Sequence, residues 1–244
     1  MKFIKLFNEQ TEFDAAKGTL YNPNVSYIKG NGGVYSLGYT YVDLGLTSGT
    51  LWAKCNVGAE KETDYGFYFQ WGDIKNKSNA ECSWTTYKYC NGSLNSMNKY
   101  CTDNSYGPVV DNKTTLESAD DAATQIMGDE WRMPTKADFQ ELVNNTTIKW
   151  FDDFNGSGVK GCTFTSTKDT SKYIFIPASG VRRKDGFTAQ NSIAFVWSSS
   201  LVVDYSINAY YLSFASNTPS PNDYGDNVRS VGLTVRGVTK RQDA

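Results

Sequence analysis

The stretch that most constrains the fold is residues 128–142, GDEWRMPTKADFQEL, which predict the first turns of an amphipathic helix. The Thr135 hydroxyl can accept a backbone N–H that the first turn leaves unpaired. Asp138, three residues later, completes a capping-box pattern with Asp in the place of Glu. Phe139 and Leu142 then recur at helical spacing on one face. The pattern predicts a well-capped core helix, and by itself it predicts no chemistry.

Several large or charged residues in this region and in the later chain are expected to be structural. Trp131 precedes the cap, where its ring can fix the incoming chain against the core. Two arginines are expected to tie loops to strands by charge-assisted hydrogen bonds, through Glu141 or Asp138. The structural set is Trp131, Arg132, Phe139, Leu142, Trp197 and Arg236.

Length and charge narrow the classes of protein. The chain has 244 residues, enough for one large domain or for one domain with a smaller one. Hydrophobic residues make up 39% and charged residues 20%, which argues against wholesale disorder. The net charge is −2 and there is no run of Lys or Arg, so no nucleic-acid partner is expected. No stretch approaches the roughly 18 apolar residues of a membrane span, so no membrane insertion is expected.

The absence of His excludes imidazole general bases, Ser-His-Asp machinery and His-containing metal sites. The five Cys include no C-x-x-C pair, so neither a zinc ribbon nor a complete disulfide framework is indicated. Cys82, Cys90 and Cys101 can pair locally, but mostly free thiols are favoured. Residues 222–227, NDYGDN, offer oxygens for Ca²⁺ without the spacing of a defined loop. No metal and no cofactor is therefore expected.

Carboxylates remain as candidate catalysts. They are Asp152 with Asp153, Asp120 with Asp121, and Glu141. Adjacent Asp residues are more typical of helix starts and turns than of a catalytic pair. The spatial separation that defines a glycosidase pair is not readable from sequence. The sequence therefore favours a protein that is not an enzyme.

Residues 1–38 are predicted to be separate from the rest of the chain. A short helix is predicted over residues 8–17, and a hairpin over residues 24–37 around the turn GNGG. A segment of this length cannot bury much surface alone, so we expect it to attach to a partner or to the main domain. The candidate attachment residues are Phe3, Phe7, Phe13 and Tyr27.

Residues 39–240 are predicted to form an α+β domain with antiparallel sheets. A helix over residues 116–127 is expected, with Ser118 as its cap and Gly128 at its end. Residues 74–114 are predicted as a long irregular insertion, a type of loop that is often functional or mobile. Residues 65–73, rich in aromatics, are predicted to be core. The main predicted strands are 41–46, 51–59, 162–166, 173–177, 194–200, 209–214 and 233–238.

Taken in order, these motifs resemble the Fibrobacter succinogenes major paralogous domain, which is common in Bacteroidetes and their phages. The resemblance covers residues 39–239 and implies a C-type-lectin-like fold, in which the first and last strands pair. The same fold is shared with the formylglycine-generating enzyme and with variable proteins of diversity-generating retroelements. The motifs are VDLGL at 42–46, LWAKCNVGA at 51–59, YGFYFQWG at 65–72, WRMPTKADFQEL at 131–142, IPASG at 176–180, VWSSS at 196–200 and VGLTVRGV at 231–238.

The resemblance directs attention to the C-terminal region. The formylglycine-generating enzyme binds copper through a late cysteine pair, and this chain has no Cys after Cys162 to carry such a site. Retroelement variable proteins place a diversified ligand face there, and the matching residues 198–227 are rich in Ser, Asn, Tyr and Asp. Tyr provides a large contact area at low entropy cost. The candidate ligand-binding residues are Asp204, Tyr205, Asn208, Tyr210, Asn217, Asn222 and Tyr224.

The start of the chain carries a second resemblance. Residues 7–15, FNEQTEFDA, and 23–27, PNVSY, are similar to leaders of structural proteins in crAss-like and other Bacteroidales phages. No secretion signal is apparent, as expected of a protein assembled into a virion in the host cytoplasm. The implied protein is a head-fibre or capsid-decoration subunit that attaches to other virion proteins and binds a host surface glycan or protein. A homo-oligomer is expected. The alternative is a bacterial surface adhesin or a retroelement variable protein.

Overall fold

The computed structural model describes residues 5–7, 26–29, 34–36, 39–216 and 226–240, with side chains for residues 39–216 and 228–240. The chain divides into two compact units, residues 1–40 and residues 41–244.

The N-terminal unit contains a three-stranded sheet of order β1-β2-β3, formed by Lys5–Phe7, Ser26–Lys29 and Val34–Ser36. β1 is parallel to β2, and β2 is antiparallel to β3. The predicted hairpin is therefore confirmed, while the predicted helix over residues 8–17 lies outside the described residues. Of the candidate attachment residues, Phe7 lies on β1 and Tyr27 on β2, whereas Phe3 and Phe13 also lie outside the described residues.

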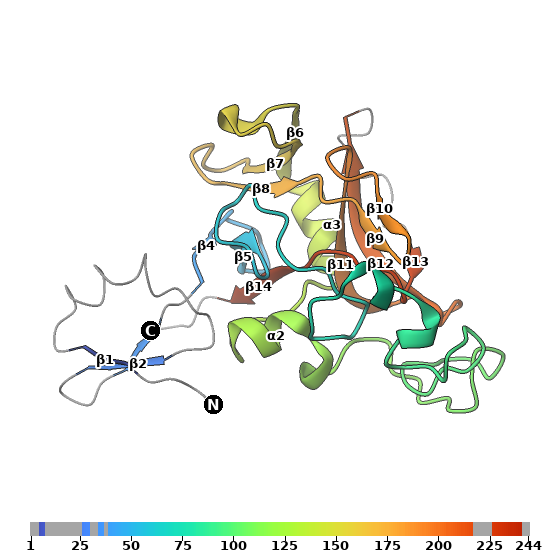
Figure 1. Ribbon diagram of the computed structural model, residues 1–244. Coiled ribbons are helices and arrows are strands. Elements are labelled where there is room, and N and C mark those ends of the chain that lie inside the picture. Colours follow the sequence, from blue (N-terminus) through green and yellow to red (C-terminus); the bar gives the residue numbers. More distant parts are fainter. Residues whose placement is uncertain (1–4, 8–25, 30–33, 37–38, 217–225, 241–244) are drawn as a thin grey trace. The chain divides into compact units, whose positions relative to one another are not determined.

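The second unit is α+β (Figure 1). Its α-helices are α2, Ala122–Met127, and α3, Lys136–Asn144. Four short 3-10 turns are also present: η1 Asn79–Glu81, η2 Trp84–Thr86, η3 Ser118–Asp120 and η4 Phe154–Gly156. Its strands are β4 Tyr41–Val42, β5 Thr50–Asn56, β6 Thr146–Phe151, β7 Gly161–Ser166, β8 Tyr173–Pro177, β9 Val181–Arg183, β10 Gly186–Thr188, β11 Ile193–Leu201, β12 Asn208–Ala215, β13 Asp226–Val228 and β14 Arg236–Lys240.

The strands form four small sheets in the described part of this unit. Their orders are β14-β5-β4, β6-β7-β8, β11-β12-β13 and β10-β9, and all their pairings are antiparallel. The last strand, β14, pairs with β5, so that Val238 lies opposite Trp52. The two-residue β4 lies on the other side of β5. The last strand thus pairs with the second strand of the unit, so the implied pairing of the first and last strands is wrong: β5 has seven residues to pair with and β4 has only two.

The helix predicted from residues 128–142 is confirmed as α3, with its capping box. The Thr135 hydroxyl accepts the Asp138 N–H at 3.1 Å, and the Asp138 carboxylate accepts the Thr135 N–H at 2.7 Å. The same carboxylate accepts two hydrogen bonds from Arg132, at 2.7 and 3.0 Å. Phe139 stacks on Trp52 with 5.7 Å between ring centroids. α3 packs against β6, β11 and β12, and so joins two of the sheets.

The helix before it is shorter than predicted. The prediction placed it over residues 116–127 with Ser118 as its cap, but Ser118 lies in the separate turn η3. Asp121 caps α2 instead, because its carboxylate accepts the Thr124 N–H at 2.9 Å. Gly128 ends the helix as predicted, with a φ of 111° that favours glycine.

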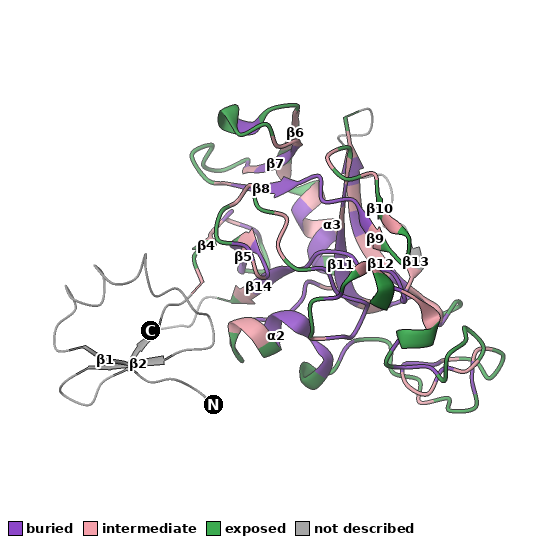
Figure 2. Cartoon of the chain, in the orientation of Figure 1, coloured by how far each residue is buried: buried purple, intermediate pink, exposed green. Residues whose placement is uncertain are grey.

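The core of the second unit consists of two clusters of buried residues. The residues expected there are buried: Trp131 is 7% exposed, Phe139 1%, and Leu142 and Trp197 0%. In Figure 2 the buried residues run through β8, β11 and β14, with exposed residues on the loops around them. All five cysteines carry free thiols. No helix among the described residues has the length and apolar character needed to cross a membrane.

Arg236 is buried in this core, and its hydrogen-bond partners differ from the predicted ones. Its guanidinium donates to the Asn56 side chain at 2.9 Å and to the backbone carbonyls of Ala53, Lys54 and Phe175. These acceptors are neutral, whereas the prediction was a carboxylate of Asp138 or Glu141. Burial lowers the pKa of Arg236 to about 10. Arg236 therefore joins β14 to β5 and β8 through backbone acceptors.

Some strands were missed or misplaced. β6 was not predicted, because its sequence TTIKWF alternates only partly and comes directly after α3. The predicted strand over residues 41–46 is reduced to Tyr41–Val42, and the one over 233–238 begins three residues later, at Arg236. Residues 65–73 are mainly irregular and largely buried, joined to Leu233 by a single bridge at Phe69. The remaining predicted strands lie close to β5, β7, β8, β11 and β12.

Candidate ligand surface

The candidate surface is the turn of residues 202–207, which connects β11 to β12. Its tip carries Val203 and Tyr205, with exposed fractions of 52% and 56%, on either side of the exposed Asp204. The turn closes on itself, because the Tyr205 N–H donates to the Val202 carbonyl at 3.1 Å and the Asn208 N–H donates to the Tyr205 carbonyl at 2.8 Å. An apolar side chain and an aromatic ring are thus presented on a backbone that is hydrogen-bonded.

The insertion of residues 74–114 supports this turn from outside the strand pair. The Thr102 N–H donates to the Ser206 hydroxyl at 2.9 Å, and the two hydroxyls of this pair lie 2.7 Å apart. The Thr102 hydroxyl also donates to the Val203 carbonyl. The turn therefore has partners about a hundred residues earlier in the chain, which no local pattern reveals.

Arg229 fixes the turn to the insertion from inside. It is fully buried and donates to the carbonyls of Ser206 at 2.7 Å and Tyr100 at 2.9 Å. It also donates to the Lys99 carbonyl and to the Tyr87 hydroxyl. A guanidinium has five donors in a fixed fork, so one side chain can hold several backbone segments at once. Arg229 was not predicted from the sequence.

The insertion is irregular, as predicted, but much of it is core. Tyr87, Tyr89, Met97 and Tyr100 are all buried in the larger hydrophobic cluster. Gly107 lies so close to Met97 that an added Cβ would meet the Met97 carbonyl oxygen at 2.1 Å. The insertion is therefore packed into the core, unlike a freely mobile loop, and it supports the turn.

An ionic network attaches the insertion to η3 through Asp120. The buried Asp120 carboxylate accepts hydrogen bonds from Lys99 at 2.6 Å, Lys88 at 3.0 Å and the Tyr100 hydroxyl at 2.6 Å. Burial acts to raise the pKa of Asp120, but the hydrogen bonds from Lys99 and Tyr100 outweigh it and hold that pKa well below its usual range. Asp120 is therefore a charged anchor.

Two further candidate ligand residues lie on β12, the strand after the turn. Asn208 and Tyr210 are two residues apart and so lie on one face of it. The Lys136 ammonium lies over the Tyr210 ring, 3.9 Å from its centroid. Asp204 and Tyr205 thus lie on the turn, and Asn208 and Tyr210 lie on the strand that follows it. Asn217, Asn222 and Tyr224, and most of the 222–227 run, lie outside the described residues.

Each acid that was considered as a catalyst has a partner within the fold. Burial raises the pKa of Asp121, even though backbone N–H groups donate to it. The described residues include no group of three His, Cys, Asp or Glu placed to hold a metal. The partners of the acids are Lys99 and Tyr100 for Asp120, Thr124 and Met133 for Asp121, Lys160 for Asp152, Gly158 for Asp153 and Ser48 for Glu141.

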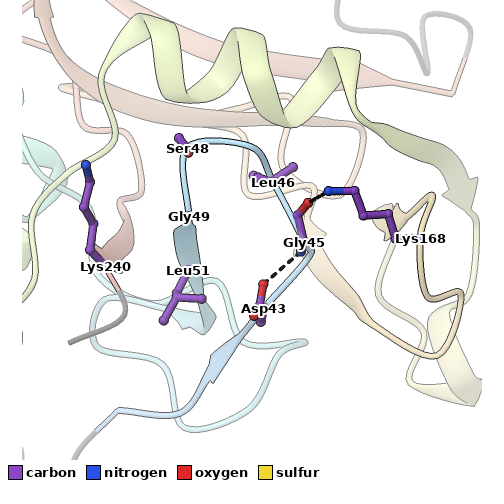
Figure 3. Close-up of a pocket in the computed structure, with 8 residues that line it drawn as sticks. All are labelled: Asp43, Gly45, Leu46, Ser48, Gly49, Leu51, Lys168 and Lys240. Carbon is purple, nitrogen blue, oxygen red and sulfur yellow. Dashed lines mark hydrogen bonds between the residues drawn. The ribbon is translucent and has the colours of Figure 1, made fainter. Parts of the chain in front are cut away.

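A hollow of about 480 Å³ lies between the β4–β5 connection, Lys168 and Lys240 (Figure 3). Two of its charged groups are directed at the same glycine: Asp43 accepts the Gly45 N–H at 2.9 Å, and Lys168 donates to the Gly45 carbonyl. These contacts hold the loop in place, and we assign no ligand to this hollow.

Comparison with family models, with curated proteins and with solved structures finds no match to this chain.

Proposed function

We propose that this protein is a non-enzymatic phage virion protein, a head-fibre or capsid-decoration subunit of a Bacteroidales phage. Its second unit would be a C-type-lectin-like domain that displays the turn of residues 202–207 toward a host surface glycan or protein. The proposal starts from the ordered motifs of residues 39–239 and from the leader-like residues 7–15 and 23–27.

The observation that carries the binding part is the construction of the turn. Exposed apolar and aromatic side chains on a firmly held backbone are typical of recognition sites, because little conformational freedom is lost on binding. Val203 and Tyr205 are among the most exposed large hydrophobic side chains of the described residues. Thr102 and Arg229 hold the backbone that carries them.

The pairing of β14 with β5 supports the lectin-like part of the proposal. It returns the end of the second unit to the sheet that holds its first two strands, although the partner is β5 and not the first strand that the resemblance implies. The large insertion that supports the late turn agrees with a fold in which long loops are held by small sheets. α3 with its capping box lies within residues 131–142, one of the motifs on which the resemblance rests.

The proposal gives residues 1–38 the role of attachment to the capsid or to another virion protein. Display proteins of this kind are usually oligomeric, and closed rotational symmetry is the common arrangement. We therefore expect a homo-oligomer in which the second units face outward. No residue of the chain is assigned a catalytic role.

Mass photometry tests the virion part. The full chain and a shortened chain that starts at Tyr39 are measured alone and after mixing with purified phage capsids. We expect a defined oligomer of the full chain and capsid binding that requires residues 1–38. If neither chain binds capsids and both are monomers, the virion proposal is wrong and the bacterial adhesin or retroelement variable protein becomes the better explanation.

A further inference from the structure

A second hollow lies on the outer face of the β6-β7-β8 sheet, which is shown in Figure 1. It has a volume of about 360 Å³, the lower end of the range for small-molecule sites. We call it the threonine hollow. It is lined by Thr147, Lys149, Phe151, Phe154, Asn155, Thr163, Thr165, Thr170 and Tyr173.

Strand alternation explains why threonines line this face. The inner face of the sheet carries Ile148, Phe164 and Ile174, which lie opposite one another and belong to the core. The next row, one residue along each strand, must therefore point outward. In that row Thr147 lies opposite Thr165, and Thr165 lies opposite Tyr173.

Aromatic rings form one side of the threonine hollow. Phe154 stacks on the buried Phe175 with 3.8 Å between centroids and 9° between planes. Phe151 and Tyr173 meet Phe154 edge-on, at 5.5 and 6.2 Å. Gly161 leaves room for the Phe175 ring, which an added Cβ would approach to 2.7 Å. The rings are thus fixed by one another before any ligand arrives.

The polar groups of the hollow lack partners within the described chain. Thr163 is only 6% exposed, yet no hydrogen bond of its hydroxyl occurs among the described residues. Nearby Thr146 and Thr167, outside the hollow, donate to backbone carbonyls. The Thr163 hydroxyl is not among the fully enclosed unpartnered atoms of the described residues, so it is accessible to a hydrogen bond from a ligand in the hollow.

The charge of the hollow is positive. Lys149 is its one charged lining residue and has no ion pair within the described part of the chain. Its ammonium lies 4.8 Å from the centroid of the Phe151 ring. A ligand with a carboxylate on a ring that has an apolar face would pair with the ammonium and pack against the aromatic ring at the same time.

We infer that the threonine hollow binds an acidic saccharide, a sugar ring that carries a carboxylate. The C–H face of the sugar would pack on Phe151 and Tyr173, its hydroxyls would exchange hydrogen bonds with Thr163 and Thr165, and its carboxylate would pair with Lys149. This inference uses no residue of the turn at 202–207 and is independent of the proposed virion function.

Calorimetric titration of the full chain tests the inference, with digalacturonate as the probe. We expect binding that weakens as salt is added. Lys149→Gln and Thr163→Val should each weaken it about tenfold or more. Thr163→Val keeps the side-chain shape and removes only the hydroxyl, so the fold should survive. Lys184→Gln, at an exposed lysine outside the hollow, is the matched control and should bind like the unaltered chain.

Two more probes separate the carboxylated sugar from other ligands. The dimethyl ester of digalacturonate should bind about tenfold less tightly, since both of its carboxylates have lost their charge. Inorganic phosphate should not compete. The inference is overturned if the unaltered chain does not bind digalacturonate, if the Lys149 and Thr163 variants bind as tightly as the control, or if the ester or phosphate binds equally well.

Discussion

At the scale of the residue, two buried arginines organise the second unit, and neither has a carboxylate partner among the described residues. Arg236 joins strands, and Arg229 joins the insertion to the turn of residues 202–207. Each guanidinium is satisfied mainly by backbone carbonyls, which are held in place by the surrounding fold. The cost of burying these charges is therefore offset only while several segments keep their positions.

Replacement of Arg229 tests this dependence. Arg229→Met removes four donated hydrogen bonds and leaves the Tyr87 hydroxyl and the Ser206, Tyr100 and Lys99 carbonyls without this donor. We expect the free energy of unfolding to fall by about 3 kcal/mol or more. Denaturant unfolding measures it, and Arg183→Met, at an exposed arginine, should change it by less than about 0.5 kcal/mol. Equal losses in both variants would contradict the role given to Arg229.

Asp120 makes the anchoring of the insertion dependent on pH. Its folded-state pKa is lowered, so its contribution to stability is present above its unfolded-state pKa of about 4 and is lost as the pH falls through the folded value. We expect Asp120→Asn to be less stable than the unaltered chain at neutral pH, and the difference to shrink as the pH falls below about 4. Urea unfolding at several pH values measures this, and a difference that stays constant would argue against the charged anchor.

At the scale of the element, α3 is the part of the fold that local chemistry determines most directly. Its cap, its N3 carboxylate and its buried face lie within nine residues of one another. Thr135→Ala should lower the free energy of unfolding by about 1 kcal/mol, because the Asp138 N–H loses its acceptor. Thr135→Ser keeps the hydroxyl and should lose much less. Thermal unfolding of the two variants makes the comparison, and equal melting temperatures would show that the cap contributes little.

Local signals account for the elements that were predictable. α3 and β8 were predicted closely, because a capping box and a short run of apolar residues are local signals. β6 was missed because its outward residues are Thr and Lys, which give a weak strand pattern. Its strand conformation depends on the hydrogen bonds with β7, which the local sequence does not reveal. α2 was predicted too long because Ser118 and Asp121 both fit the N-cap of a helix, and only the fold shows that Asp121 is the cap.

The candidate site was predictable only in part, because the contacts that hold it join residues far apart in the sequence. The composition of the late region pointed to Asp204 and Tyr205, which the structure places at the exposed tip of a turn. The groups that hold the turn, Thr102 and Arg229, lie far from it in sequence or carry no local motif. The threonine hollow was not predicted either, since its row of hydroxyls exists only once three strands pair in register.

At the scale of the whole molecule, the chain consists of a small sheet-forming unit and a larger α+β unit. We give the first unit an attachment role and the second a display role. Stability of the second unit should then be largely its own, because its core is formed from its own residues. The shortened chain that starts at Tyr39 should therefore unfold cooperatively, and circular dichroism during heating would measure this. A shortened chain without a cooperative transition would contradict the division.

The most direct test of the central claim is binding of the full chain to an array of host surface glycans and to Bacteroidales cells, with and without Tyr205→Ser. Tyr41→Ser is the matched control, since Tyr41 and Tyr205 are both 56% exposed and only Tyr205 lies on the turn. We predict that the unaltered chain binds, that Tyr205→Ser weakens binding about tenfold or more, and that Tyr41→Ser leaves it unchanged. Equal binding by both variants, or no binding by the unaltered chain, would contradict the claim that this turn is the receptor-binding surface.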